Sequence, residues 1–295
     1  MFLVLLILAC GSSGAQVRQV TVTWQPSRLA NGSPVLFRMT APANVESMSA
    51  EWLGHSFSFF REGHSGRWYA LAGVSLKTPA GVYTLKLAEN FADGPSTAIE
   101  KQIKVYAATY KKIPIRVARQ FTEPNPGQVA TIAADKGIKE RTFAAVSERR
   151  LWSGPFIPPV SEPVSDLFGT ERVINGKVQS RHQGLDYAAP AGTPVRAINR
   201  GVVLLARPMF FEGNFIVIDH GQGLLSLYLH LSEFKVKEGD HVSGGQVIAL
   251  SGGTGRATGA HLHLSVRWQG IYLDPAILLR LMIPQAKNDQ SVPNS

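Results

Sequence analysis

The sequence His182-Gln183-Gly184-Leu185-Asp186, with His261-Leu262-His263 further along the chain, is the most informative part of this protein. Its four metal-capable side chains occur in two tight clusters. Imidazole nitrogens and carboxylate oxygens are good zinc ligands, and a catalytic zinc typically has three protein ligands and one open position. Two clusters with four candidates supply three ligands and one spare base. The pattern therefore predicts a zinc hydrolase.

The spacing within each cluster indicates how the side chains converge. Residues i and i+2 of a strand point to the same face, so His261 and His263 would share one exposed face. Glycine adopts backbone conformations that are closed to other residues, and we expect Gly184 to form the sharp loop that brings His182 and Asp186 to one ion. Both clusters can thus serve a single metal ion.

A further imidazole, His230, lies in Tyr228-Leu229-His230-Leu231 at the end of a predicted strand. Strand alternation places it on the same face as Tyr228. His230 is the best remaining candidate for a second active-site imidazole. The other histidines fall in predicted turns or stand alone, and we assign none of them to the site: His55, His64, His220 and His241.

The composition fits a globular, mainly β protein. The 295 residues are 44% hydrophobic and 17% charged, and they include 28 Gly and 18 Pro. Such values are typical of loop-rich folded domains and exclude a wholly disordered chain. A single cysteine excludes an intramolecular disulfide framework.

Positive charge is concentrated in one part of the chain. The formal net charge is +9, and residues 101–150 contain 11 Lys and Arg against 4 Asp and Glu. Such a segment either attracts an anionic polymer at long range or forms a solvated basic face. No nucleic-acid recognition motif accompanies it, so we expect no nucleic-acid partner.

Hydrophobic periodicity predicts two β domains joined by a connector. Residues 16–106 contain six or seven short strands with regular turns, typical of an immunoglobulin-like β-sandwich, including one strand over 51–61 with a kink at Leu53 and Gly54. Residues 107–164 form a helical and Pro-rich connector, in which Gly137 is expected to divide the helical part into two. Residues 165–285 contain a second set of strands, and residues 286–295 are expected to be a disordered tail.

The proline-rich part of the connector runs from Trp152 to Pro159. Prolines fix the backbone and remove hydrogen-bond donors, so this segment is expected to be an extended strap. Trp152 and Phe156 are expected to pack the strap against the domain that follows.

The first residues indicate export. Residues 1–15, MFLVLLILACGSSGA, combine a short apolar run with small residues, as in a secretory signal peptide cleaved before Gln16. Alternatively, Ile7-Leu8-Ala9-Cys10 resembles a weak lipobox, in which case a lipidated Cys10 would anchor the protein to a membrane. In either case we expect a location in the periplasm, the cell envelope or the extracellular space.

The C-terminal region resembles the lysostaphin-type (LytM-like) zinc endopeptidases of bacterial peptidoglycan. The resemblance runs from about Ser165 to Leu279, and its motifs stand in the family's order: His182 to Val195, Gly213-Asn214, Asp219-His220-Gly221, Tyr228 to Ser232, Gly239 to Val242 and Gly252 to His263. It implies an antiparallel β-sheet peptidase domain (a duplicated hybrid motif) that holds one zinc ion per chain.

The resemblance also assigns a role to each candidate. It implies that His182, Asp186 and His263 bind the zinc, and that His261 and His230 assist catalysis. One of these two would accept the proton of the attacking water and return it to the leaving amine, and the other would stabilise the oxyanion. The sequence does not assign the two tasks.

Two positions depart from the family pattern. Some members place a tyrosine shortly before the first zinc histidine, where it stabilises the oxyanion, but residues 173–181 contain none. Arg181 or a histidine would have to supply that charge. Ala260 stands where members usually have proline. Neither departure removes a ligand or a base.

Together, these features predict a monomeric zinc endopeptidase that hydrolyses peptide cross-links of peptidoglycan. Two bonds remain open, D-alanyl–diaminopimelyl and glycyl–glycyl. The alternative is a non-catalytic or autoinhibited envelope module that binds peptidoglycan or activates a separate cell-wall amidase. Relatives of that kind have lost zinc ligands, whereas every ligand position is filled here. We expect the N-terminal sandwich to position or partly cover the substrate groove.

Overall fold

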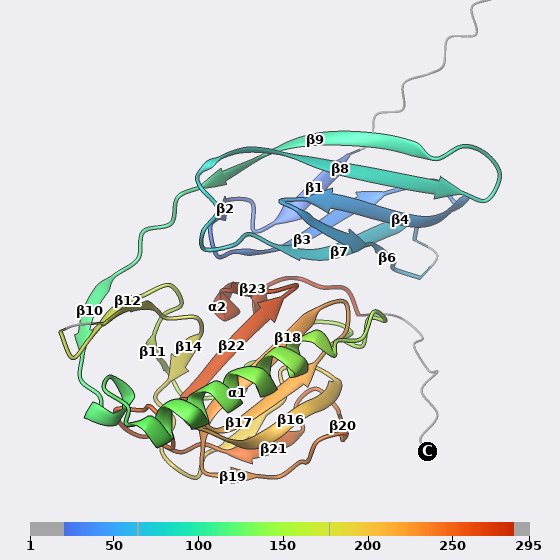
Figure 1. The fold of residues 1–295 in the computed structure, drawn as a ribbon. Coiled ribbons are helices and arrows are strands. Elements are labelled where there is room, and N and C mark those ends of the chain that lie inside the picture. The colour runs from blue at the N-terminus through green and yellow to red at the C-terminus, as the bar shows by residue number, and fades with distance from the viewer. Residues whose placement is uncertain (1–20, 64, 177, 286–295) are drawn as a thin grey trace, which may run out of the picture.

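The computed structural model describes residues 21–63, 65–176 and 178–285. The predicted signal peptide, Cys10, His64 and the tail from residue 286 lie outside these ranges. As predicted, the described chain is mainly β. Two β bodies lie one above the other, joined by an extended segment (Figure 1). None of the helices in the described ranges is long and apolar enough to cross a membrane.

The N-terminal body consists of two sheets. In spatial order, the first contains β1 (Val22–Gln25), β3 (Pro34–Thr40), β7 (Arg67–Gly73) and β6 (Phe60–Arg61). The second contains β2 (Leu29–Ala30), β9 (Thr97–Tyr106), β8 (Gly81–Phe91), β4 (Val45–Trp52) and β5 (His55–Ser58). Aromatic rings meet between the sheets, since the ring of Phe37 lies 5.4 Å from that of Trp52. Assignment of this two-layer body to the immunoglobulin-like class stays a prediction.

The segment expected as one kinked strand over residues 51–61 is instead a hairpin. Leu53 and Gly54 have positive φ values of 52° and 80°, and they connect β4 to β5 with Trp52 paired to His55. Two consecutive residues with positive φ match the twist of paired strands in tight turns, where Asn and Gly are preferred. Leu53 hides this turn from sequence analysis because leucine rarely adopts the left-handed conformation.

A larger antiparallel sheet forms the C-terminal body. Its order is β11 (Val164–Asp166), β14 (Leu185–Tyr187), β22 (Leu262–Trp268), β18 (Leu224–Leu231), β17 (Gly213–Asp219), β16 (Gly201–Met209) and β20 (His241–Val242), with β23 (Ile271–Leu273) paired to β22. A smaller sheet contains β15 (Pro194–Arg196), β21 (Val247–Leu250) and β19 (Glu233–Phe234), and the short helix α2 (Pro275–Leu278) follows β23. The central strands are almost wholly buried, so this sheet is a rigid support for whatever side chains it presents.

The connector is built into the C-terminal body. Strand β10 (Lys112–Ile115) pairs in parallel with β12 (Glu171–Ile174), which pairs with β13 (Val178–Arg181). A 3₁₀ turn η1 (Arg119–Phe121) and helix α1 (Pro126–Ala144) follow β10. The connector therefore begins inside a sheet of the C-terminal body rather than as a free linker.

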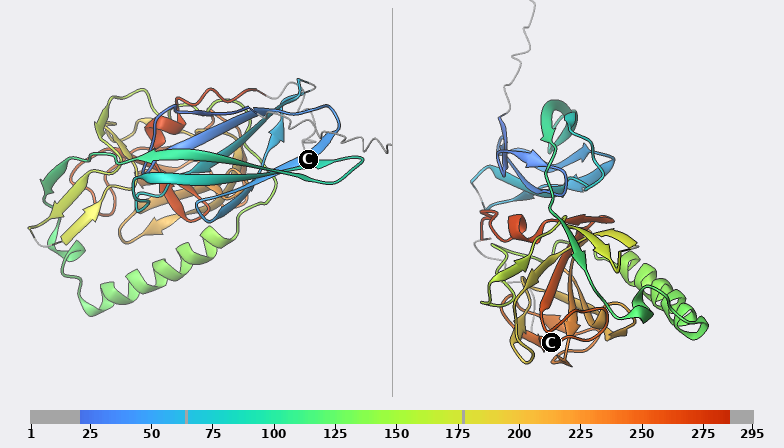
Figure 2. Two further views of the ribbon diagram at one scale, coloured as in Figure 1. Left: turned by 90° about the horizontal axis from the view of Figure 1, so that it is seen from above. Right: turned by 90° about the vertical axis from the view of Figure 1, so that its left-hand side faces the viewer.

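Helix α1 is continuous, so the expectation that Gly137 divides it was wrong. The helix begins with Asn125 and Gln128, whose side chains bond each other's backbone N–H groups, and with Pro126 in its first turn. An interior glycine costs only about 1 kcal/mol relative to alanine. Packing of Ile138 and Phe143 against the sheet offsets that cost, on an apolar cluster of Leu205, Met209, Phe215, Val217, Leu225 and Leu227. Figure 2 shows α1 along one side of the body.

The proline-rich strap packs as predicted and also reaches the N-terminal body. Trp152 and Phe156 are buried. The ring of Phe156 lies 6.0 Å from that of His220 in the C-terminal body, whereas Trp152 contacts Phe60 of the N-terminal body at 5.1 Å. The strap therefore contributes buried side chains to the hydrophobic cores of both bodies.

The two bodies also meet directly at the end of β22. The ring of Trp268 lies 5.9 Å from that of Phe57, and the Gln269 side chain donates a hydrogen bond of 2.9 Å to the Ser56 carbonyl. Buried apolar residues form one continuous cluster across this contact. The domain boundaries at residues 106, 164 and 285 remain predictions.

Candidate metal centre

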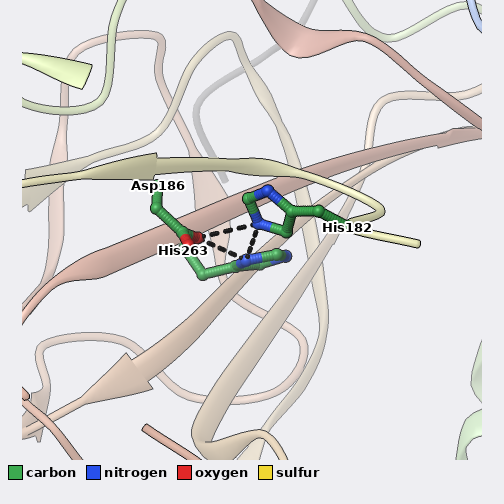
Figure 3. A group of neighbouring side chains, drawn as sticks. All are labelled: His182, Asp186 and His263. Atoms are coloured by element: carbon green, nitrogen blue, oxygen red, sulfur yellow. Dashed lines mark hydrogen bonds and ion pairs between the residues drawn. The ribbon is translucent and has the colours of Figure 1, made fainter. Parts of the chain in front are cut away.

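His182, Asp186 and His263 form a compact triangle of ligand atoms (Figure 3). His182 Nε2 lies 3.0 Å from Asp186 Oδ1 and 3.0 Å from His263 Nδ1. His263 Nδ1 lies 2.7 Å from Asp186 Oδ1. All three residues are buried. The structure thus brings together the three residues that the sequence proposed as ligands.

Strand register sets two corners of this triangle. Asp186 on β14 is the Cα partner of His263 on β22, and Leu185 and Leu264 on the same strands are buried on the apolar side. Alternation along a strand therefore turns the carboxylate and the imidazole away from the core together. His182 follows the last residue of β13 and completes the group from the side.

Gly184 is required for space rather than for its backbone conformation. Its φ is not positive, so the loop that brings His182 and Asp186 together does not depend on the left-handed backbone conformation of glycine. A Cβ atom at this position would lie 2.5 Å from the Leu264 carbonyl oxygen and closer still to His263 Nε2. The loop therefore crosses directly over the second ligand, and only glycine fits.

The hydrogen bonding of His182 shows that the triangle suits a cation. His182 Nδ1 lies 2.8 Å from the Leu167 carbonyl oxygen, which can only accept, so Nδ1 carries the proton. The lone pair of Nε2 then faces a carboxylate oxygen and a second imidazole nitrogen. A tetrahedral zinc site with bonds of about 2.0 Å places its ligand atoms roughly 3.3 Å apart, close to this spacing. Two nitrogens and one carboxylate oxygen fit zinc in number, type and arrangement.

A second layer of charge surrounds the triangle. Arg172 Nη2 lies 2.6 Å from Asp186 Oδ2 and 2.5 Å from Asp166 Oδ2. The guanidinium thus holds the carboxylate oxygen that does not face the histidines. Outer partners of this kind orient metal ligands. Sequence analysis assigned no site role to Arg172 or Asp166, and the strand pattern of β11 and β12 gave no signal that they converge.

Burial and the neighbouring charges set the protonation of the triangle. Burial alone would raise the pKa of Asp186, but the imidazoles of His263 and His182 lower it by more, and the carboxylate stays ionised. Burial lowers the pKa of His263 to about 4, although Asp186 opposes the shift. An ionised carboxylate and a neutral imidazole are the forms that bind a metal.

His230 reaches the site by an unusual backbone conformation. Its φ is 63°, in a region that non-glycine residues rarely adopt. Tyr228 points to the other side, into a buried contact with Ser226 and the Ile198 N–H. The prediction that His230 and Tyr228 share a face was therefore wrong. The left-handed residue breaks the alternation and turns His230 toward the groove.

His230 and His261 lie side by side next to the triangle. Their ring centroids are 4.7 Å apart, and His261 Nε2 lies 4.0 Å from Asp186 Oδ1. Nδ1 of each ring donates to a carbonyl, Thr254 at 2.8 Å for His230 and Gly259 at 2.9 Å for His261. In the neutral form of each ring, this bond leaves the lone pair on Nε2. Burial, with His263 and His261, lowers the pKa of His230 to about 3.

Arg181, the cation expected to stabilise the oxyanion, and two of the histidines that were not assigned to the site lie outside the triangle. Arg181 pairs with Glu171 at 2.7 Å, and both side chains are largely exposed. His220 is buried between the Arg200 carbonyl and the Ser226 hydroxyl, at 2.7 Å from each. His55 contacts Gln269 where the two bodies meet. None of these histidines is near the triangle.

A groove of about 870 Å³ opens over the five site residues. Strand β10 and helix α1 provide one side of it through Ile113, Ile115, Lys139 and Phe143. Phe211, Glu212 and the loop from Arg256 to Ala260 also line it. The described residues of the N-terminal body contribute nothing to this lining, so the expected partial cover comes from the connector. A chain of several residues can lie across the triangle.

Comparison with known proteins shows that the part of the chain that contains the triangle is similar to a known peptidase family. Residues 180–275 match the model of Peptidase family M23. The chain is 45% identical over 107 residues to the peptidoglycan DD-endopeptidase ShyA of Vibrio cholerae serotype O1, covering 36% of this chain and 24% of that protein. It is 48% identical over 94 residues to the DD-carboxypeptidase/endopeptidase Mpg of Neisseria meningitidis serogroup B, covering 32% and 22%. The chain thus spans about a quarter of the length of these relatives.

A solved structure extends the likeness to most of the chain. The crystal structure of a putative peptidase M23 from Pseudomonas aeruginosa has a TM-score of 0.64 and 28% identity, and the match covers 85% of this chain and 95% of that one. The fold around the triangle and beyond it is therefore shared with a peptidase of the same family. From residue 180 to residue 275, this chain is a peptidase domain of family M23.

Proposed function

We propose that this protein is a zinc endopeptidase that hydrolyses D-alanyl–diaminopimelyl cross-links of bacterial peptidoglycan. One observation carries the proposal: three buried zinc-type ligands and two further imidazoles converge beneath an open groove. The relatives named as DD-endopeptidases favour this bond over glycyl–glycyl. Such a substrate requires a location in the cell envelope, which agrees with the export signal expected in residues 1–15.

His182 Nε2, Asp186 Oδ1 and His263 Nδ1 would hold the zinc. When bound, the metal polarises the scissile carbonyl and makes hydroxide available near neutral pH. Arg172 orients the Asp186 carboxylate through its hydrogen bond to Oδ2. The carbonyl of Leu167 keeps His182 in the tautomer whose Nε2 is free to bind.

We assign the proton transfer to His261 and a supporting role to His230. Both rings line the groove with Nδ1 bonded to a carbonyl, so in the neutral form either Nε2 can accept a proton from the attacking water. The His261 side chain is 18% exposed, and it can pass the proton on to the leaving amine. Burial keeps His230 neutral. Its fixed ring orients the attacking water through Nε2.

The test is digestion of isolated peptidoglycan by the purified protein, with and without a zinc chelator. Mass spectrometry then identifies the new amine and carboxyl ends. We expect chelator-sensitive cuts between D-alanine and diaminopimelate, and none with His263→Ala. A zinc-loaded protein that makes no cut would support the non-catalytic alternative, in which the groove only binds peptidoglycan or a cell-wall amidase. Cuts at another bond would keep the enzyme but change its substrate.

A further inference from the structure

The groove carries more positive charge than the metal triangle uses. Five cationic side chains line it among the described residues: Lys111, Lys139, Arg172, Arg181 and Arg256. Three of them are neutralised by acids of the protein, Lys139 by Glu212, Arg172 by Asp166 and Asp186, and Arg181 by Glu171. Lys111, which directly precedes β10, is exposed to solvent. Arg256 is the remaining cation.

Arg256 is half-buried and has no ionic partner of its own. Its guanidinium lies over the Phe211 ring, 4.8 Å from the ring centroid. Within the described ranges, no hydrogen-bond acceptor or carboxylate contacts the guanidinium. The nearby acid Glu212 is already paired with Lys139 at 2.5 Å. An arginine presents five donors in a planar fork that matches a carboxylate, so an unoccupied fork in a substrate groove indicates an anionic ligand.

The loop that carries Arg256 is fixed before any substrate arrives. The Arg256 N–H donates to the Phe211 carbonyl at 2.8 Å. Gly255 packs on Gly213 so closely that a Cβ atom would lie 2.7 Å from the Phe211 carbonyl oxygen and closer still to the Gly213 nitrogen. Thr254, two residues before Arg256, supplies the carbonyl that orients His230. The backbone of Arg256 is thus fixed in the lining of the groove that His230 and His261 also line.

Electrostatics agree with a site that receives an anion. Burial lowers the pKa of Arg256, Glu212 opposes that shift, and Arg172 adds to it. The guanidinium remains charged because an arginine side chain keeps its proton in proteins. A partly desolvated cation gains more from an ionic partner than an exposed one does. A substrate carboxylate would supply that partner.

We propose that Arg256 binds the substrate carboxylate that stands next to the scissile nitrogen. This inference rests on the proposed function. In a D-alanyl–diaminopimelyl cross-link, the carbon that carries the scissile nitrogen also carries a free carboxylate. A terminal D-alanyl–D-alanine has a carboxylate in the same place. A glycyl–glycyl bond inside a peptide bridge has none, so Arg256 selects anionic D,D bonds over neutral bridges.

Two matched substrates test this proposal. Both are cross-linked muropeptide dimers, and they differ only in whether the carboxylate next to the scissile nitrogen is free or a primary amide. We expect the zinc-loaded wild type to prefer the free acid in kcat/KM by about 10- to 100-fold, as for the loss of charge-assisted hydrogen bonds. Arg256→Gln should reduce the preference to within about 2-fold, and Arg256→Lys should fall between them because it keeps the charge without the fork.

The controls separate this role from folding and from the function itself. Arg181→Gln changes an arginine of the same groove that is already paired, and it should keep the wild-type preference. Binding of both dimers to the metal-free protein, measured by calorimetry, should show the same order without catalysis. Equal use of the two dimers by the wild type, or an unchanged preference in a folded Arg256→Gln variant, would overturn the proposal. If no dimer is cleaved, the proposed function fails, and the binding preference alone decides the role of Arg256.

Discussion

Main-chain carbonyls orient three of the four imidazoles at this site. Leu167, Thr254 and Gly259 accept the Nδ1 protons of His182, His230 and His261 at 2.8 to 2.9 Å. Each bond fixes both the tautomer and the ring angle, so the Nε2 atoms are directed before metal or substrate binds. Any residue type has a carbonyl, and for this reason the sequence could identify the imidazoles but not the groups that orient them.

Zinc content separates the two kinds of histidine. His263→Ala removes a corner of the triangle, and we expect the purified variant to lose most of its zinc. His230→Ala should retain about one zinc per chain and lose turnover by roughly 100-fold, because the attacking water loses the ring that orients it. Elemental analysis and peptidoglycan digestion measure the two quantities. Equal zinc loss in both variants would contradict the roles assigned here.

Arg172 should tune metal affinity without contacting the metal. Removing its charge with Arg172→Gln frees the second oxygen of Asp186, and we expect zinc affinity to fall by about 10- to 100-fold. Competition with a chromophoric chelator measures this affinity. Arg181→Gln is the matched control, because its guanidinium pairs with an exposed glutamate. A similar affinity loss in the control would indicate a general charge effect instead.

The buried His220 should make stability depend on pH. Burial lowers its pKa from 6.5 to about 4, so the unfolded state binds more protons between these values. The free energy of unfolding should therefore be highest above pH 6.5 and fall as the pH decreases toward 4, by on the order of 3 kcal/mol from this group. Denaturant titration of the metal-free protein measures the fall.

His220→Gln should reduce that pH dependence, since glutamine does not titrate. His241→Gln is the control, because His241 lies on the surface in β20. If the two variants lose stability with pH as steeply as the wild type does, the dependence arises from other groups.

At the scale of secondary-structure elements, the loop that contains Gly255 and the turn at Gly213 pack on each other and position His230. The loop from Gly252 to His261 closes through a bridge between these two residues. The Thr254 hydroxyl accepts a hydrogen bond from the N–H of Asn214 at the start of β17. The backbones of Gly213 and Gly255 touch where the turns cross. A shift of either turn would move the carbonyl that orients His230.

Gly255→Ala should therefore damage the site as well as the fold. Its φ is 71°, and backbone atoms of the adjoining turn already occupy the space of a Cβ. Gly239→Ala is the matched control, with a φ of 91° and open space around it. The control should cost only the left-handed conformation, about 1–2 kcal/mol, whereas Gly255→Ala should cost more and also reduce turnover. Thermal unfolding and digestion rates compare them, and equal losses would refute the crossing as the cause.

Sequence analysis succeeded for features that the chemical type of a side chain determines. The convergence of the proposed ligands, the β character and the packing of Trp152 and Phe156 follow from side-chain chemistry and alternation. It failed for features that depend on the backbone conformation of one residue or on a contact between distant parts of the chain. Leu53 forms a turn with positive φ, and His230 leaves its strand pattern for the same reason. Arg172 joins the site through a contact between two different sheets, in which its guanidinium lies 2.6 Å from Asp186. The local sequence pattern does not indicate such a contact.

For the whole molecule, the continuous core predicts a single unfolding event. Trp268, Phe57 and Trp152 belong to one buried cluster that spans both bodies. We expect one calorimetric transition whose enthalpy equals the van't Hoff value. Trp268→Ala removes a ring at the contact. It should lower the midpoint temperature of this single transition and reduce the free energy of unfolding by about 3–5 kcal/mol. Two transitions, with only one affected by the substitution, would show that the bodies unfold independently.

The pairing of β10 with β12 matters to anyone who transplants this peptidase into another protein. Ile113 of β10 stands opposite Arg172 of β12, and α1, which follows β10, lines the groove as well. A fusion that starts at residue 165 would keep His182, Asp186 and His263. It would lack the side of the groove that β10 and α1 form. A fusion that starts before Lys112 would contain both the three residues of the triangle and this side of the groove.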